Sequence, residues 1–286
     1  SKEELDKDPT GEDVYIEAKD GTQIRAKCAG EGPTVVLAHC YGMSMREWNI
    51  IWKMLIDKGY RVISWDHRGH GKTRSATLPL SSHLMAEDYL TVLQHFNVTN
   101  SILVGHSMGG FLSIIFQLNY PEEAAKHLRG FVMFASTAGN ALKGAPQNQL
   151  QIPLMRVGII QKICASKNFS WHFGASIFGD NPSPNAIQAF NTSFLEQDHR
   201  ALSPVLTALS NEDYYPRLQE IETPCVVISG EKDNTCPEWH GLALNANLPN
   251  ARRMIISGCG HMLNWESPES LVSAIASLRE PVTDSV

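Results

Sequence analysis

The sequence has no long apolar run and no cluster of basic residues. No stretch reaches the roughly eighteen consecutive apolar residues typical of a membrane-spanning helix, so we expect no transmembrane segment. The basic residues never gather into a long run, and the net charge at pH 7 is −6. A negative chain offers nucleic acid no electrostatic attraction. These absences point away from nucleic-acid and membrane-spanning proteins and leave a small molecule as the expected partner.

The spacings typical of metal sites are also missing. The six cysteines include no C-x-x-C pair, and the eleven histidines include neither H-x-x-x-H nor H-E-x-x-H. In a chain of 286 residues, scattered cysteines are expected to be reduced and mostly buried thiols. We therefore expect neither a metal nor a cofactor. The cysteines are Cys28, Cys40, Cys164, Cys225, Cys236 and Cys259.

The first residues do not resemble a secretion signal. Residues 1–8 are mostly charged, whereas a signal peptide needs an apolar core, so we expect a cytoplasmic protein. The sequence does not begin with Met, and export therefore stays open. Residues 1–12 and 281–286 are expected to be solvated tails. A content of 43% hydrophobic and 19% charged residues is typical of a globular domain.

Strand and helix patterns alternate through the first half of the chain. Alternating residues at 14–18 and 22–28, joined by Asp20-Gly21, predict an antiparallel hairpin. Continuous apolar runs then predict strands that are buried on both faces, and helical patterns lie between them. This alternation predicts a parallel sheet covered on both faces by helices. The runs are 34–38, 60–65, 101–105 and 130–135, and the helices are 45–58, 82–96 and 107–119.

The strands disappear between residues 137 and 216, where helical patterns occupy 151–164, 186–195 and 201–209. Strand runs at 223–230 and 251–256 then resume, with helices at 237–246 and 268–278. We therefore expect an α/β fold with a mostly parallel sheet of about eight strands and an inserted helical cap. The expected core covers 13–136 and 217–280, and the expected cap covers 137–216.

The pentapeptide Gly-His-Ser-Met-Gly at 105–109 lies between a predicted strand and a predicted helix. It fits the G-x-S-x-G turn, which presents a nucleophilic serine in a strained backbone conformation. Glycines at 105 and 109 allow the helix to approach the strand closely. The helix N-terminus supplies backbone N–H groups that can stabilise an oxyanion. Ser107 is therefore the candidate nucleophile.

A serine hydroxyl needs a base, and the base needs an orienting acid. In the chain order Ser, Asp or Glu, His, both partners follow the nucleophile. Asp233 comes directly after the strand at 223–230, and His261 follows the last strand. The carboxyl ends of parallel strands meet at one edge of a sheet, so Asp233 and His261 should approach Ser107. Asp66 precedes the serine, and Glu231 is expected to face solvent.

These stretches resemble the α/β-hydrolase family over about residues 13–280. The resemblance implies Ser107 as nucleophile, His261 as general base and acid, and Asp233 as its orienting carboxylate. Within the family, the chain is similar to carboxylesterases and monoacylglycerol-lipase-like members. The matching stretches are Leu-Ala-His-Cys-Tyr-Gly at 37–42, Asp-His-Arg-Gly-His-Gly at 66–71, Gly-His-Ser-Met-Gly-Gly at 105–110, Gly-Glu-Lys-Asp at 230–233 and Gly-His at 260–261.

The same resemblance implies an oxyanion hole made by the backbone N–H groups of Tyr41 and Met108. One residue departs from the family pattern, because Cys40 stands where members usually have glycine after the histidine of this loop. A side chain there could alter the turn that aims the Tyr41 N–H. The thiol itself is expected to be buried and inert.

Three further residues are candidates for the substrate pocket. Met262 follows the catalytic histidine, and Trp171 and Phe173 lie in the expected cap. Each could contact an acyl group, and each could equally pack in the core or anchor the cap.

The expected function is hydrolysis of a carboxylic ester through an acyl-Ser107 intermediate. The substrate class would be a small or medium ester, an acylglycerol or a lactone. Two alternatives stay open. The same three residues could serve a perhydrolase or haloperoxidase-like enzyme, a C–C hydrolase or a lyase, or the chain could be a non-enzymatic ligand-binding protein. A carboxylate-nucleophile enzyme is disfavoured, because the nucleophile position holds Ser107.

Overall fold

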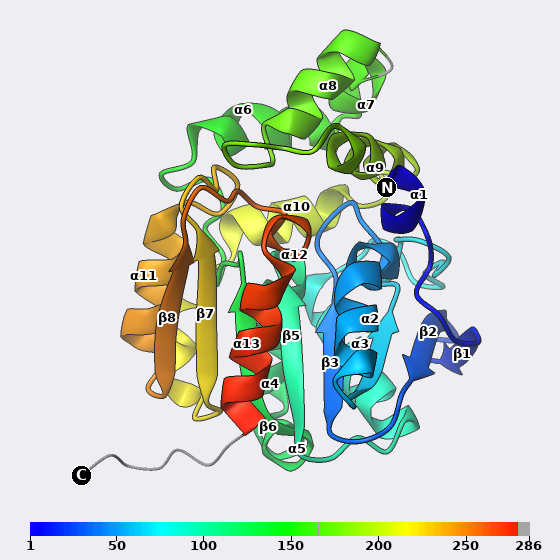
Figure 1. Ribbon diagram of the computed structural model, residues 1–286, viewed down its shortest axis with the longest axis vertical. Coiled ribbons are helices and arrows are strands. Elements are labelled where there is room, and N and C mark those ends of the chain that lie inside the picture. The colour runs from blue at the N-terminus through cyan, green and yellow to red at the C-terminus, as the bar shows by residue number, and fades with distance from the viewer. Residues whose placement is uncertain (165, 280–286) are drawn as a thin grey trace.

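The computed structural model describes residues 1–164 and 166–279, and its strands form one eight-stranded sheet (Figure 1). The strand order is β1-β2-β4-β3-β5-β6-β7-β8, in which β2 is antiparallel to both neighbours and the remaining pairs are parallel. This confirms the mostly parallel sheet of about eight strands. The strands are β1 (Val14–Glu17), β2 (Gln23–Ala29), β3 (Thr34–Ala38), β4 (Arg61–Trp65), β5 (Ser101–His106), β6 (Leu128–Phe134), β7 (Cys225–Gly230) and β8 (Ala251–Ile256).

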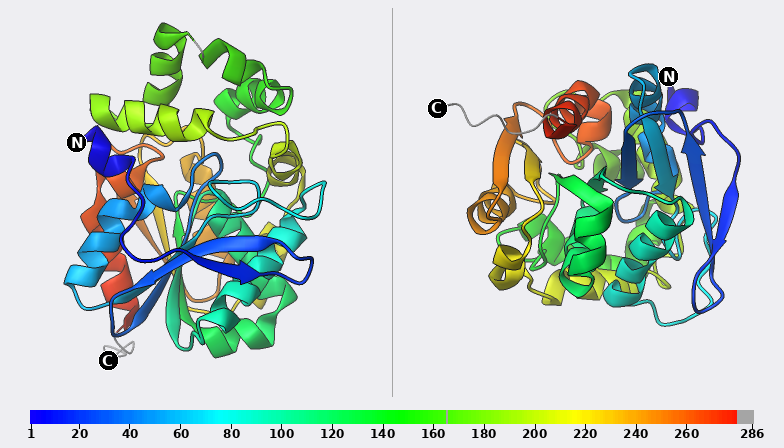
Figure 2. Two further views of the ribbon diagram at one scale, coloured as in Figure 1. Left: turned by 90° about the vertical axis from the view of Figure 1, so that its right-hand side faces the viewer. Right: turned by 90° about the horizontal axis from the view of Figure 1, so that it is seen from below.

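Helices cover both faces of the sheet, as the view along the sheet in Figure 2 shows. Helices α2 and α13 pack on one face, and α3, α4 and α11 pack on the other. None of the described helices combines the length and apolar character that crossing a membrane requires. The helices are α1 (Lys2–Leu5), η1 (Met45–Trp48), α2 (Asn49–Asp57), α3 (Ser82–His95), α4 (Met108–Asn119), α5 (Pro121–His127), α6 (Pro146–Arg156), α7 (Ile159–Cys164), α8 (Lys167–Ala175), α9 (Pro184–Leu195), α10 (Ser203–Asn211), η2 (Tyr215–Glu220), α11 (Glu238–Asn247), α12 (Leu263–Glu266) and α13 (Pro268–Arg279).

The central strands are buried on both faces, which explains their continuous apolar runs. Successive side chains of a strand point to opposite faces. In β3, Val35 and Leu37 accordingly join the core under α2 and α13, whereas Val36 and Ala38 join the core on the other face. All six residues of β5 are buried, so the strand that carries the candidate nucleophile lies at the centre of the molecule.

Helices α6 to α10 lie over the carboxyl ends of the parallel strands (Figure 1). That residues 137–216 form a cap with these limits stays a prediction. Within this layer, the single helix expected at 151–164 is two helices, α6 and α7. Gly158 separates them with a φ of +74°, a left-handed conformation that glycine adopts without strain.

Residues 1–12 differ from the solvated tail that we expected. They begin with helix α1, in which Leu5 is buried, and Asp8 lies 2.5 Å from the buried Arg25 guanidinium. The hydrogen bond from Arg25 also lowers the pKa of Asp13 to about 2. No local sequence pattern indicates these ion pairs, because the partners are distant along the chain. The other expected tail, 281–286, lies outside the described residues.

A buried ion pair fixes the loop after β4 to helix α3. Arg68 donates to both carboxylate oxygens of Asp88 at 2.7 and 2.8 Å, and both side chains are almost fully buried. Asp88→Ala removes both of these hydrogen bonds and leaves the buried Arg68 with the carboxylate of Asp20, 2.6 Å away, so we expect it to lower the free energy of unfolding by about 2–4 kcal/mol. Urea unfolding with an unchanged slope would measure this loss.

The neighbouring Glu87 supplies the control, because it forms an ion pair with the exposed Lys19. Glu87→Ala should cost less than about 1 kcal/mol. Equal effects of Asp88→Ala and Glu87→Ala would contradict this assignment.

Candidate active site

Ser107 occupies the sharp turn between β5 and α4. Its φ of +52° is unusual for a residue with a side chain, and strain of this kind is often found at functional sites. The flanking glycines are required by close approach. A Cβ on Gly105 would lie 2.4 Å from Gly110 Cα, and one on Gly109 would lie 2.2 Å from the Ala38 carbonyl oxygen. The helix therefore starts directly against the strand, as the G-x-S-x-G pattern predicted.

The structure brings Asp233 and His261 together at the carboxyl edge of the sheet. Asp233 follows β7, and its Oδ2 lies 2.9 Å from Nδ1 of His261, which follows β8. The other carboxylate oxygen accepts the backbone N–H groups of Thr235 and Cys236, both at 2.8 Å. These two bonds hold the carboxylate in place and leave Oδ2 free for the histidine. Both residues are buried, each with 5% exposure.

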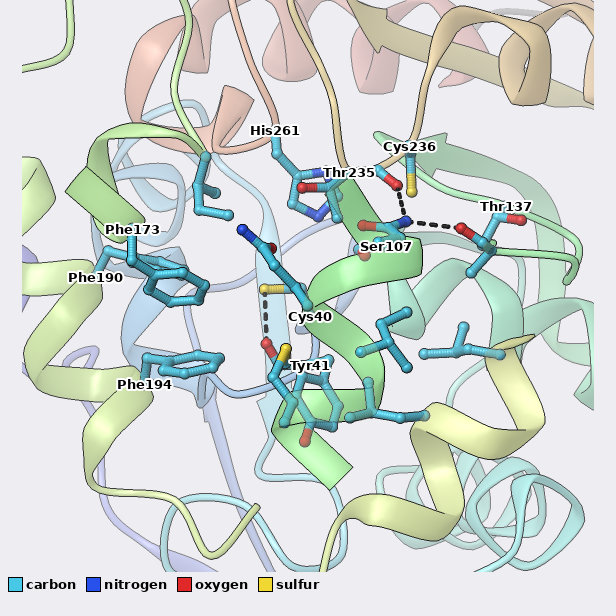
Figure 3. Close-up of a pocket in the computed structure, with 18 residues that line it drawn as sticks. Cys40, Tyr41, Ser107, Thr137, Phe173, Phe190, Phe194, Thr235, Cys236 and His261 are labelled. Carbon is cyan, nitrogen blue, oxygen red and sulfur yellow. Dashed lines mark hydrogen bonds between the residues drawn. The ribbon is translucent and has the colours of Figure 1, made fainter. Parts of the chain in front are cut away.

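Ser107 and His261 line the same cavity, which lies between the sheet edge and the α6–α10 layer (Figure 3). Among the hydrogen bonds of the described residues, none joins Ser107 Oγ to His261 Nε2. In enzymes without substrate, such contacts are often long and tighten only in the complex. The arrangement can thus present a hydroxyl and an imidazole to one bound molecule, with the Asp233 carboxylate behind the imidazole.

The two expected oxyanion donors lie beside Ser107. Met108 is the first residue of α4, and Tyr41 lines the cavity with Ser107. In the described part of the chain, neither the Tyr41 N–H nor the Met108 N–H has a hydrogen-bond acceptor. Unpaired N–H groups next to a nucleophile are available to a developing negative charge.

Most of the remaining cavity wall is apolar and comes from the helices above the sheet. Phe190 and Phe194, four residues apart on α9, stack with their ring centroids 5.6 Å apart. Sequence reasoning missed them, although their helical spacing was a usable signal. The polar part of the wall is formed by uncharged groups, among them Thr137, Asn148 and Thr235. The apolar wall residues are Ala141, Ile152, Met155, Phe173, Ile177, Phe190, Phe194, Leu206 and Leu209.

Of the three pocket candidates, only Phe173 lines the cavity. Met262 is fully buried at the start of α12, where it belongs to the hydrophobic core. Trp171 is 38% exposed on α8, two residues before Phe173. Residues two apart on a helix face different directions, so Trp171 and Phe173 cannot share one contact surface. We therefore no longer assign Met262 and Trp171 to the substrate pocket.

The two other candidate acids have structural partners, and two further histidines, in the loop after β4, are buried. Asp66 is fully buried and accepts the backbone N–H groups of Met45 and Lys72 at 3.0 and 2.9 Å. Glu231 is exposed, as expected, and accepts the Gly258 N–H. Burial lowers the pKa of both His67 and His70 well below the usual range, so these rings are neutral.

Two cysteines also line the cavity. Burial raises the pKa of both Cys40 and Cys236, so both are neutral thiols. Asp233, Cys236 and His261 each have a metal-ligating atom within 4.8 Å of the others. However, Asp233 Oδ2 and His261 already bind each other, and Asp233 Oδ1 accepts two backbone N–H groups. We therefore assign no metal to this group.

Comparisons with known proteins agree with the fold. The model of the Alpha/beta hydrolase family matches residues 35–274. A 2-hydroxy-6-oxononadienedioate/2-hydroxy-6-oxononatrienedioate hydrolase of Cupriavidus pinatubonensis is 30% identical over 90% of this chain and 91% of its own length. A 2-hydroxy-6-oxo-6-phenylhexa-2,4-dienoate hydrolase of Burkholderia cepacia is 26% identical over 93% and 95%. The structure of an esterase from Exiguobacterium antarcticum superposes with a TM-score of 0.81 at 23% identity, covering 95% of this chain and 100% of that one.

Proposed function

The chain belongs to the alpha/beta hydrolase family, and from this premise we propose that it hydrolyses uncharged carboxylic esters through an acyl-Ser107 intermediate. One observation carries the proposal. Ser107, on a strained turn, shares a cavity with His261, whose Nδ1 is 2.9 Å from the Asp233 carboxylate. This is the set of groups that acyl transfer to a serine needs.

Asp233 determines which nitrogen of His261 acts as the base. A carboxylate oxygen can only accept a hydrogen bond, so the proton of the neutral ring resides on Nδ1. Nε2 then has a free lone pair for the Ser107 proton. When the ester binds and brings Ser107 Oγ to Nε2, the serine attacks the carbonyl carbon. The imidazolium is stabilised by Asp233, and it returns the proton to the departing alcohol.

The Tyr41 and Met108 N–H groups hold the oxyanion of the tetrahedral intermediate. Loss of one such donor typically costs about 3–4 kcal/mol of transition-state stabilisation. Water then enters, gives its proton to His261 Nε2 and attacks the acyl carbon. A second tetrahedral intermediate collapses, the proton passes to Ser107 Oγ, and the carboxylic acid is released.

The chemistry of the cavity wall supports an uncharged substrate. Among the described residues that line it, His261 is the only ionisable group besides the two thiols and Tyr41, and no arginine or lysine is present. A carboxylate taken into such a pocket would lose its hydration without gaining a cation. Aromatic and aliphatic side chains instead favour an alkyl or aryl acyl group.

A second candidate is hydrolysis of a C–C bond, because the two curated relatives named above are C–C hydrolases by name. Those names denote substrates with one or two carboxylates, and an enzyme that accepts them needs a site for that charge. The described cavity wall of this chain supplies no cation for it. The ester is therefore the better match to the geometry, and the C–C substrate is the alternative that the experiment must include.

A matched pair of substrates tests the proposal. We expect p-nitrophenyl hexanoate to be hydrolysed with a kcat/KM at least about tenfold higher than the p-nitrophenyl monoester of adipic acid, because the acyl chains are equally long and only the second carries a carboxylate. Cleavage of 2-hydroxy-6-oxo-6-phenylhexa-2,4-dienoate is followed in parallel. Faster turnover of this acid than of any neutral ester would replace the proposal with C–C hydrolysis.

A further inference from the structure

A fully buried glutamate, Glu47 of η1, lies beneath the candidate active site and is not part of it. Three groups contact its carboxylate. The Cys40 thiol donates to Oε2 at 3.1 Å, and the Cys40 N–H donates to Oε1 at 3.3 Å. His106 Nδ1 lies 2.9 Å from the same Oε1. Glu47 thus joins the loop that carries the Tyr41 N–H to the turn that carries Ser107.

The same residue also reaches the segment that carries His261. The Glu47 carbonyl oxygen accepts from Asn264 Nδ2 at 2.8 Å and from Trp265 Nε1 at 2.9 Å. The second nitrogen of His106, Nε2, lies 3.0 Å from the His261 carbonyl oxygen. Three segments far apart in the sequence, after β3, β5 and β8, are therefore connected through Glu47 and His106.

The contacts of His106 determine how many protons the Glu47–His106 pair carries. The His261 carbonyl oxygen can only accept, so His106 Nε2 must carry a hydrogen. The contact between Nδ1 and Glu47 then needs a second proton, either on the ring or on the carboxyl group. Either placement makes the pair neutral as a whole. A neutral, fully hydrogen-bonded pair is the form that a site with no exposed surface tolerates.

Cys40 fits this arrangement, which explains the departure at that position. Of residues 40–42, only Gly42 has a positive φ, so the backbone at 40 does not require glycine. The Cys40 side chain instead supplies a thiol that binds Glu47. The loop that aims the Tyr41 N–H is therefore anchored from below by two bonds from one residue.

We propose that Glu47 and His106 are positioning residues that align the oxyanion donors and the catalytic histidine with Ser107. The proposal rests on the ester hydrolysis proposed above. Neither residue touches substrate, since neither lines the cavity. Their action is confined to groups that stabilise the transition state, so their loss should lower kcat and leave KM nearly unchanged.

The first test is Glu47→Gln. An amide keeps the shape of the side chain, but it cannot carry the shared proton, and its nitrogen cannot accept a hydrogen bond. We expect kcat to fall on the order of 10- to 100-fold, as is typical when a supporting group behind a reactive site is lost. An alkyl boronic acid, which mimics the tetrahedral intermediate, should bind more weakly by the same factor. Glu220→Gln, on the surface, is the control and should match the wild type.

Active-site titration with a fluorophosphonate normalises every rate to the reactive fraction, so misfolded protein does not imitate the effect. Cys40→Ala serves as the second variant, because it removes only the thiol contact. It should give a smaller loss in the same direction. His106→Gln keeps an amide near the Nε2 position, and His106→Asn keeps one near Nδ1. Each variant keeps one of the two His106 contacts, to the His261 carbonyl oxygen or to Glu47, and the kcat of both should fall below that of the wild type.

The inference is overturned if titrated Glu47→Gln keeps the wild-type kcat and boronic-acid affinity, or if KM rises as much as kcat falls. These results differ from failure of the proposed function. In that case wild-type protein itself would show neither labelling of Ser107 nor ester turnover.

Discussion

Ser107→Ala is expected to reduce kcat for ester hydrolysis by roughly five to six orders of magnitude. When the nucleophile of a serine hydrolase is removed, the remaining groups cannot form the acyl intermediate, and losses near 10⁶-fold are typical. The turn itself should persist, because its geometry depends on close approach at Gly105 and Gly109 rather than on the hydroxyl. The rate is measured with p-nitrophenyl hexanoate, and the melting temperature shows that the fold is retained.

Ser113→Ala is the matched control for this variant. Ser113 lies on α4, the helix that follows Ser107, is also buried, and donates its hydroxyl to the Gly110 carbonyl oxygen. It does not line the cavity. If Ser113→Ala keeps near-normal turnover and Ser107→Ala is inactive, the nucleophile is the Ser107 hydroxyl. Residual turnover within tenfold of the wild type in Ser107→Ala would instead mean that another group attacks the substrate.

Asp233→Asn is expected to lower kcat on the order of 10⁴-fold, because it reverses the tautomer of His261. Thr235 and Cys236 both donate backbone N–H groups to Oδ1, and they would keep the amide oxygen of an asparagine at that position. The amide nitrogen would then face His261 Nδ1. Since that nitrogen is a donor, Nδ1 would have to accept, and the ring proton would move to Nε2. A protonated Nε2 cannot take the proton of Ser107.

The control is Asp57→Asn, an exposed carboxylate at the end of α2. It carries the same change of charge and should leave kcat at the wild-type value. KM in Asp233→Asn should change little, because the carboxylate does not line the cavity. A loss of less than about tenfold in kcat would show that Asp233 does not orient the base.

The order of the chain was enough to predict that Asp233 and His261 meet at one edge of the sheet. Glycines around Ser107 indicate a tight strand-to-helix turn, and the ends of parallel strands must share one edge of a sheet. Asp233 and His261 could thus be expected beside Ser107 without knowledge of side-chain contacts. Their 2.9 Å contact agrees with this placement, because Asp233 follows β7 and His261 follows the neighbouring parallel strand β8.

The cavity wall was harder to predict, because helices above a sheet have no fixed register with it. Trp171 and Phe173 are only two residues apart, yet of the two only Phe173 lines the cavity. The burial of Glu47 was equally hard to predict from the sequence. Glu47 falls in the helix expected at 45–58, but a helical pattern does not show which distant segments will cover a given residue, and only the packing of three such segments encloses Glu47 completely. Long-range contacts of this kind leave no periodic signal in the sequence.

The most direct test of an acyl-Ser107 intermediate is the mass of the protein during turnover. The enzyme is mixed with p-nitrophenyl hexanoate, quenched with acid within the burst of p-nitrophenol release, and measured intact and after digestion. A hexanoyl adduct is expected on the peptide that contains Ser107, and no adduct is expected in Ser107→Ala. Turnover without any acyl adduct, or an adduct on Cys40 or Cys236 instead, would contradict an acyl-Ser107 intermediate.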